Sequence, residues 1–125
     1  MIKKLERMVL TTENINKCIE FYEILGLKVK VNNGNFSLEA EGIKINLYVK
    51  DVTNDEIIMP LNVQSGCESL AFEVDKDINY IIKELMDNNI KIEGGVLMKE
   101  GLKGTCKSIL VKDPDNNIIE LVSYK

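Results

Sequence analysis

Apolar residues recur at helical spacing in two segments of the chain. The first stripe consists of Ile15, Cys18, Ile19, Tyr22 and Leu25, and the second of Ile78, Ile81, Ile82 and Leu85. Residues 12–14, Thr-Glu-Asn, precede the first stripe and Asp77 precedes the second, and these side chains can accept hydrogen bonds from a first helical turn. The pattern predicts two amphipathic helices, of which the first closes at Gly26 and the second ends at Asn88-Asn89.

Runs of strand-forming residues surround both helices. In the first half the runs cover residues 5–11, 27–32, 35–40 and 43–49, and in the second half residues 69–74, 90–96, 106–111 and 118–123. Asn33 and Gly34 separate two of these runs, and this dipeptide tolerates the positive φ angles of a tight hairpin turn. Each half is therefore predicted to be a β-α-β-β-β unit.

The two halves match when one is shifted by 63 residues along the other. The shift places Ile15 on Ile78 and Ile19 on Ile82, and it aligns residues 27–29 with residues 90–92. We interpret this as a duplicated unit within one domain, residues 1–125, since a chain of this length normally forms a single domain. Unit one covers about 1–50, the connection about 51–66, and unit two about 67–125.

The tandem order of elements, closing with Asp113-Pro-Asp-Asn-Asn-Ile-Ile-Glu120, resembles the vicinal oxygen chelate superfamily. Phe21-Tyr22 and Leu25-Gly26-Leu27 add to the likeness. This superfamily includes glyoxalase I, extradiol dioxygenases, fosfomycin-resistance enzymes and bleomycin-resistance proteins. The resemblance implies an α+β fold in which the units form a curled mixed sheet around a cavity, and a homodimer in which both chains contribute to each cavity. Taken alone, Asp-Pro-Asp-Asn-Asn is also ordinary turn chemistry.

Strand alternation sorts the candidate site residues by face, because successive side chains of a strand point to opposite sides. Four predicted strands offer Arg7, Tyr48, Ser69 and Glu120 toward the cavity, and Asn46 shares the face of Tyr48. The resemblance marks the first four as metal-ligand positions. We therefore expect these five residues to form the ligand-binding site.

Only one of the four positions carries a good metal ligand. The chain contains no histidine, and the guanidinium of Arg7 offers donors alone. Neutral Tyr48 and Ser69 coordinate transition metals poorly, which leaves Glu120. No metal site and no cofactor are predicted, although a divalent metal stays open as an alternative.

A buried carboxylate has to be paired, hydrated or neutralised. Our hypothesis is that Arg7 bonds Glu120 in roughly the volume of the missing metal, with Tyr48 and Ser69 completing a polar patch. The alternative is that Arg7 and Glu120 are both solvated on an open sheet face.

Three lysines lie near two glycine-containing segments, residues 94–95 and 101–104. Lys99, Lys103 and Lys107 could meet an anionic ligand there, while the glycines themselves are expected to serve flexible turns.

Composition narrows the class of protein. With 45% hydrophobic and 29% charged residues the chain is typical of a globular protein. A net charge of −4 with scattered basic residues gives no nucleic-acid footprint. No apolar run reaches the roughly 20 residues of a membrane helix, and the N-terminus lacks a signal-peptide core, so we expect a cytoplasmic protein. The three cysteines have no CxxC spacing and are expected to be free thiols.

Three functions stay open. The first is a protein that binds a small molecule, preferably an anion, in its cavity without metal, as bleomycin-resistance proteins hold their drug. The second is an enzyme, either a lyase or isomerase of the glyoxalase type or a dioxygenase, with or without metal. A metal-independent enzyme would use Glu120 as base and Arg7 or Tyr48 to stabilise an oxyanion. The third is a non-catalytic dimeric interaction module.

Overall fold

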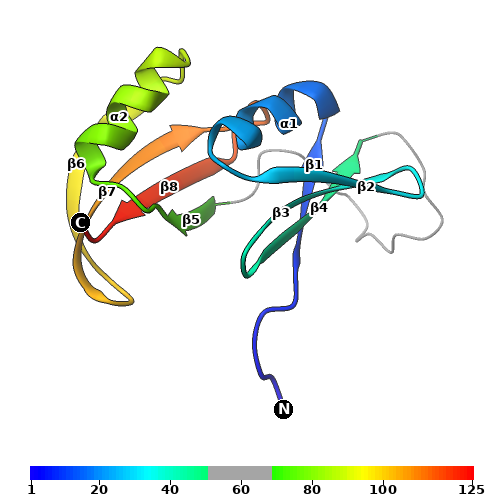
Figure 1. Cartoon of the computed structure of the whole chain (residues 1–125), viewed down its shortest axis with the longest axis horizontal. Helices are drawn as coiled ribbons and strands as arrows, with labels where there is room; N and C mark the ends of the chain where they lie inside the picture. Colours follow the sequence, from blue (N-terminus) through cyan, green and yellow to red (C-terminus); the bar gives the residue numbers. More distant parts are fainter. Residues whose placement is uncertain (51–68) are drawn as a thin grey trace. The chain divides into compact units, whose positions relative to one another are not determined.

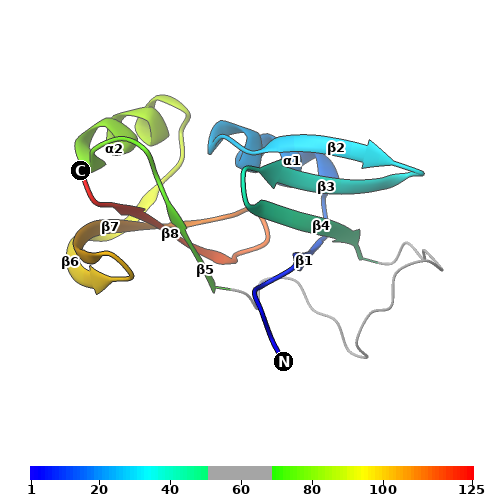
Figure 2. The same cartoon turned by 60° about the horizontal axis from the view of Figure 1, so that its bottom comes forward.

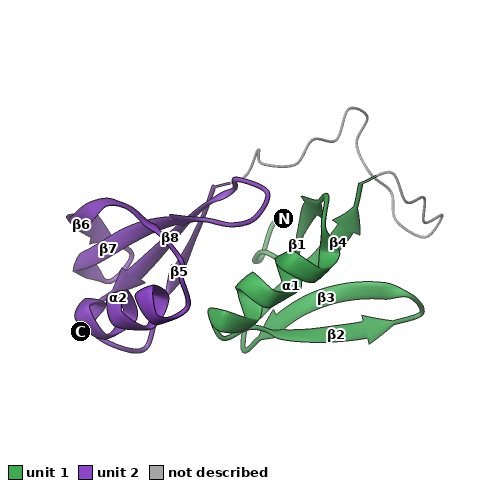
Figure 3. Cartoon of the chain, turned by 90° about the horizontal axis from the view of Figure 1, so that it is seen from above, with its two compact units in different colours: residues 1–67 green, residues 68–125 purple. Residues whose placement is uncertain are grey.

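The computed structural model describes residues 1–50 and 69–125, and the chain divides into two compact units (Figure 3). The first unit spans Met1–Cys67 and the second Glu68–Lys125. The predicted connection, 51–66, and Cys67 lie outside the described residues. That the chain is one domain stays a prediction.

The first unit is a four-stranded sheet with one helix (Figure 1). Its elements are β1 (Met8–Thr12), α1 (Ile15–Ile24), β2 (Lys28–Asn32), β3 (Asn35–Ala40) and β4 (Ile43–Val49). The strand order is β1-β4-β3-β2, in which β1 pairs with β4 in parallel and the other pairs are antiparallel.

The second unit repeats this arrangement. Its elements are β5 (Ser69–Glu73), α2 (Ile78–Asp87), β6 (Ile92–Gly101), β7 (Gly104–Lys112) and β8 (Ile118–Ser123). The order is β5-β8-β7-β6, with β5 and β8 parallel and the other pairs antiparallel. The helices begin at Ile15 and Ile78, which are 63 positions apart. The predicted duplication of a β-α-β-β-β unit is thus confirmed.

Local sequence signals set the ends of the elements as expected. Asn14 caps α1 by accepting a hydrogen bond from the Lys17 N–H at 3.0 Å. Asp77 caps α2 by accepting from the second and third N–H groups of that helix. Asn33 and Gly34 have φ angles of 52° and 79°, the left-handed values that the hairpin turn between β2 and β3 requires.

Each sheet buries one face against its own helix. The buried apolar residues of the first unit are Leu10, Cys18, Phe21, Tyr22, Leu27, Leu38, Ile45 and Leu47. Those of the second unit are Leu70, Ile78, Ile81, Leu85, Ile109, Val111, Ile119 and Leu121, while Cys106 is buried on the opposite face of its sheet. Cys18 and Cys106 are buried and form no disulfide, as expected for these two cysteines. No helix among the described residues is long and apolar enough to cross a membrane.

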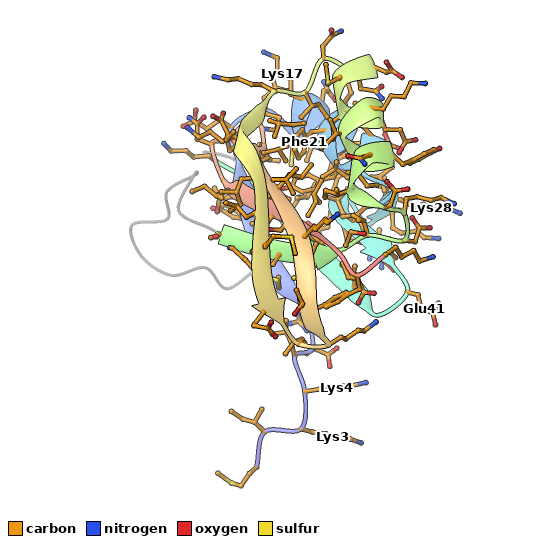
Figure 4. All side chains as sticks on the ribbon, turned by 90° about the vertical axis from the view of Figure 1, so that its left-hand side faces the viewer. Lys3, Lys4, Lys17, Phe21, Lys28 and Glu41 are labelled. Carbon is orange, nitrogen blue, oxygen red and sulfur yellow. The ribbon has the colours of Figure 1, made fainter. Side chains whose placement is uncertain are left out.

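The first strand is shorter than predicted. It begins at Met8 rather than Leu5, and residues 1–7 are exposed; Figure 4 shows Lys3 and Lys4 on this segment. Because Met8 lies beside Ile45, one further step of the parallel register would place Arg7 beside Lys44. Neighbouring like charges destabilise a strand pair, which is a physical reason for the strand to start after Arg7.

The hairpin of β6 and β7 is longer than predicted. β6 runs on to Gly101 and β7 begins at Gly104, so the expected flexible turn is confined to Leu102 and Lys103. Gly94 and Gly95 lie inside β6, at an irregularity in its pairing with β7, and not at a turn. Figures 1 and 2 show both strands strongly curved. Lys99 therefore lies on strand β6, and Lys103 lies in the turn of the hairpin.

Candidate functional site

The segment Asp113–Asn117 fixes the start of β8, and with it the position of Glu120. Asp113 is buried, and its Oδ1 accepts hydrogen bonds from the N–H groups of Asp115 and Asn117, both at 2.9 Å. Its Oδ2 accepts from Asn117 Nδ2 at 2.8 Å. Asn116 takes a left-handed φ of 65°. Residues 113–117 thus form a hydrogen-bonded turn that fixes the register of β8 in the sheet.

Glu120 points to the face of the second sheet that lies opposite the buried Ile119 and Leu121. The β5 and β8 pairing sets Ala71 beside Glu120, while the β7 and β8 pairing sets Leu110 beside it. Its side chain is 18% exposed. We call this side of the sheet the pocket face.

Two side chains hold the Glu120 carboxylate. Lys99 Nζ lies 2.7 Å from Glu120 Oε2, and Ser108 Oγ donates to the same oxygen at 2.7 Å. The hydrogen bond from Lys99, followed by that from Ser108, lowers the pKa of Glu120 below its ordinary value. Glu120 is therefore ionised at neutral pH and serves as an anchor for an ammonium group.

A second ion pair lies on the same face. Lys103 Nζ, at the tip of the β6–β7 hairpin, lies 2.9 Å from Glu73 Oε2 on β5. The backbone N–H of Lys103 donates to the Tyr124 hydroxyl at 3.2 Å, and Lys103 Nζ lies 5.5 Å from the Tyr124 ring centroid. The hairpin tip is thus tied across the pocket face to the opposite edge strand and to the C-terminal segment.

These contacts enclose a pocket of about 280 Å³ built within the second unit. Its walls include Ala71, Glu73, Lys99, Lys103, Cys106 and Glu120. A larger hollow of about 440 Å³ lies along α1, but one helix alone lines it and no cation contributes to it. Binding sites combine apolar walls with a few convergent polar groups, so the pocket of the second unit is the better candidate.

The predicted site residues divide between the two units. In the first unit, Val9 lies beside Asn46 and Thr11 beside Tyr48, so Asn46 and Tyr48 share one face of that sheet. In the second, Ser69 is exposed on β5 and lies beside Ile118, one position along the face from Glu120. Arg7 belongs to the first unit and Glu120 to the second, and their pairing stays a prediction.

Sequence reasoning missed the partners that Glu120 has within its own unit. Lys99 was singled out only as a lysine able to meet an anion, and Ser108 was not singled out at all. Lys99 and Lys103 do line the pocket, whereas Lys107 does not. Ser108 is fully buried on β7, where it lies beside Val122 of β8. A hydroxyl residue within a predicted strand is the sequence signal that could have identified it as a partner of Glu120.

The described residues around Glu120 do not fit a tightly held transition metal. A metal at Glu120 would compete with the ammonium of Lys99 for Oε2 and be repelled by its charge. Among the described residues there is no group of three or more Cys, Asp or Glu side chains placed to hold a metal ion. Imidazole is unavailable in a chain without histidine.

Two β-α-β-β-β units with open four-stranded mixed sheets define a protein of the vicinal oxygen chelate fold. A family model described as a glyoxalase-like domain matches residues 5–124. The chain therefore belongs to the glyoxalase-like domain family, within the vicinal oxygen chelate superfamily.

Individual relatives agree with this assignment. The chain is 34% identical to the glyoxalase domain-containing protein RDO1 of Mycosarcoma maydis over 126 residues, covering 99% of this chain and 70% of that protein. It is similar to the integron cassette protein VCH_CASS1 from V. cholerae, with 31% identity, a TM-score of 0.91, and coverage of 100% of this chain and 98% of that one. The fosfomycin resistance protein FosX from Listeria monocytogenes shares the fold at 16% identity, with a TM-score of 0.71 and coverage of 100% and 96%.

Proposed function

We propose that the protein binds a small molecule in the pocket of the second unit, without a tightly held divalent metal. One observation carries the proposal: Lys99 and Ser108 already hold Glu120, the one good ligand among the four family positions. At the Glu120 carboxylate, the ammonium of Lys99 takes the place of a metal ion. Membership of the glyoxalase-like family supports a ligand-binding role for this face of the sheet.

The pocket suits a small ligand. Its volume of about 280 Å³ lies just below the range of about 300–1,000 Å³ for ligand pockets. Ala71, Leu102 and Val122 supply apolar surface, and Lys99 and Lys103 supply cations. This lining favours a compact molecule with an apolar body and an anionic group.

An enzymatic reaction with Glu120 as general base is less well supported. A base that works near neutral pH needs a pKa close to that pH. Lys99 and Ser108 instead lower the pKa of Glu120. An enzyme on this site would need another group to accept a proton.

The proposal retains two expectations from the sequence. The first is that Arg7 contributes a second cation to Glu120. The second expectation is assembly as a homodimer in the cytoplasm.

Metal analysis together with thermal unfolding tests the proposal. We expect the purified protein to contain no stoichiometric Zn²⁺, Ni²⁺ or Mn²⁺ and its midpoint not to rise when these ions are added. In a screen of small metabolites, a ligand of the pocket raises the midpoint because it stabilises the native state. The size of that rise should change in Glu120→Ala, which frees Lys99 at the pocket wall, and should stay the same in Glu84→Ala, which alters an exposed carboxylate on α2. Stoichiometric metal that is lost in Glu120→Ala would overturn the proposal.

A further inference from the structure

The two ion pairs of the pocket differ in how firmly they are held. The side chains of Lys99 and Glu120 are 45% and 18% exposed, and Ser108 reinforces the pair. The side chains of Lys103 and Glu73 are 61% and 48% exposed, and among the described residues no further donor holds Glu73. Because exposed pairs contribute little to stability, the pair of Lys103 and Glu73 is the one that can exchange.

Lys103 has contacts besides the one with Glu73. Its backbone N–H bonds the Tyr124 hydroxyl, and its ammonium lies near the Tyr124 ring. Tyr124 in turn packs closely on Gly101, where a Cβ would collide with the Tyr124 hydroxyl. These contacts do not involve Glu73, so they remain available to Lys103 when the carboxylate turns into solvent.

We infer that Glu73 is an internal competitor that occupies the place of a ligand's anionic group, and that the ligand is a small organic carboxylate which takes over Lys103. This inference rests on the proposed function and names the ligand class of the same pocket. The pair of Lys99 and Glu120 remains intact when the ligand binds. Ala71, Leu102 and Val122 receive the apolar body.

Competition between Glu73 and the ligand for Lys103 sets the affinity of the pocket for a carboxylate. A ligand carboxylate must displace Glu73 from Lys103, and it then lies near two remaining carboxylates of the pocket wall, Glu100 and Glu120. Both effects weaken binding of an anion to the wild-type protein. Removing the charge of Glu73 removes the competitor and one source of repulsion, so it should strengthen binding of anions and leave neutral molecules unaffected.

Benzoate and its neutral isostere benzamide are suitable probes, with binding followed by NMR at the backbone amides of Gly101, Lys103 and Tyr124 in the full chain. We expect benzoate to bind the wild type weakly and benzamide at least tenfold more weakly. Glu73→Gln should bind benzoate about five- to tenfold more tightly with benzamide unchanged. Lys103→Met should lose the preference for benzoate over benzamide.

Matched substitutions control for general charge effects. Glu93→Gln and Lys107→Met change the same residue types outside the pocket and should bind benzoate like the wild type. The amide spectrum of each variant shows whether the fold is retained. If the wild type binds benzoate at these amides and Glu73→Gln binds it no more tightly, the inference fails while the proposed function stands. If neither protein binds benzoate, the inference also fails, and the metabolite screen alone decides the proposed function.

Discussion

At the scale of single residues, Lys99 determines what Glu120 can do. Its ammonium and the Ser108 hydroxyl both donate to the ionised form of the carboxylate. Groups that bond the charged form favour it, which is why the pKa of Glu120 is lowered. The ionised carboxylate of Glu120 therefore orients the Lys99 side chain across the pocket face.

Glu120→Gln tests this coupling through pH. Since the folded-state pKa of Glu120 is lowered, its contribution to stability is present above its ordinary pKa of 4.5 and is lost as pH falls through the lowered value. We expect Glu120→Gln to reduce the free energy of unfolding by about 1–2 kcal/mol near neutral pH, the size of a charge-assisted hydrogen bond in a partly exposed site.

The measurement is urea unfolding of both proteins from neutral pH downwards. The difference between them should shrink toward zero once the wild-type carboxylate is protonated. An equal difference at every pH would mean that Glu120 acts through its packing and not through its charge.

At the scale of elements, the turn before β8 depends on one buried carboxylate. The Asp113 carboxylate accepts hydrogen bonds from the backbone N–H groups of Asp115 and Asn117 and from the Asn117 side-chain amide. Asp113→Ala leaves these donors unpaired, and we expect a loss of about 2–4 kcal/mol in the free energy of unfolding, measured with urea. Asp75→Ala, at an exposed position, is the control and should cost little. Equal effects of the two substitutions would contradict the role given to this turn.

The hairpin of β6 and β7 has its own constraint at Gly101. An added Cβ would collide with the Tyr124 hydroxyl and lie 3.2 Å from Cys106 Sγ. We expect Gly101→Ala to displace Tyr124, to break its bond to the Lys103 N–H, and to lower stability by about 1 kcal/mol. The displacement is measurable as a shift of the Lys103 amide in the NMR spectrum.

Gly95→Ala is the matched control on the same strand, since a Cβ there meets nothing within 4 Å. Combining Gly101→Ala with Tyr124→Phe removes the colliding hydroxyl and should cost no more than Tyr124→Phe alone. A Gly101→Ala protein with an unchanged Lys103 amide would show that the contact with Tyr124 is not formed.

Much of each element could be predicted because its signals are local. Asn14, Asp77 and Asn33-Gly34 mark caps and a turn through their own side chains and backbone preferences. The length of β6 could not be predicted in the same way. Gly94 and Gly95 look like a turn, and only pairing with β7 carries the strand past them.

At the scale of the whole molecule, the duplication was predictable and the contacts of the site were not. Helical stripes spaced 63 residues apart identify two equivalent units in the sequence. Glu120 could be assigned to the pocket face because strands alternate. Its contact with Lys99 depends on how strongly β6 and β7 curve, since Lys99 lies on the edge strand, two strands away from β8. Alternation contains no information about such curvature.

Assembly is the remaining prediction at this scale. Each sheet is open, with β1 and β2 at the edges of the first and β5 and β6 at the edges of the second. Open edges expose backbone groups that proteins usually cover, and the superfamily resemblance implies a second copy. We expect light scattering coupled to size-exclusion chromatography to give twice the chain mass of 14.2 kDa. Raising the salt concentration, which screens charge contacts, should leave an apolar dimer intact. A mass of one chain at every concentration would contradict a cavity shared between two copies and leave the pocket of the second unit to function within a monomer.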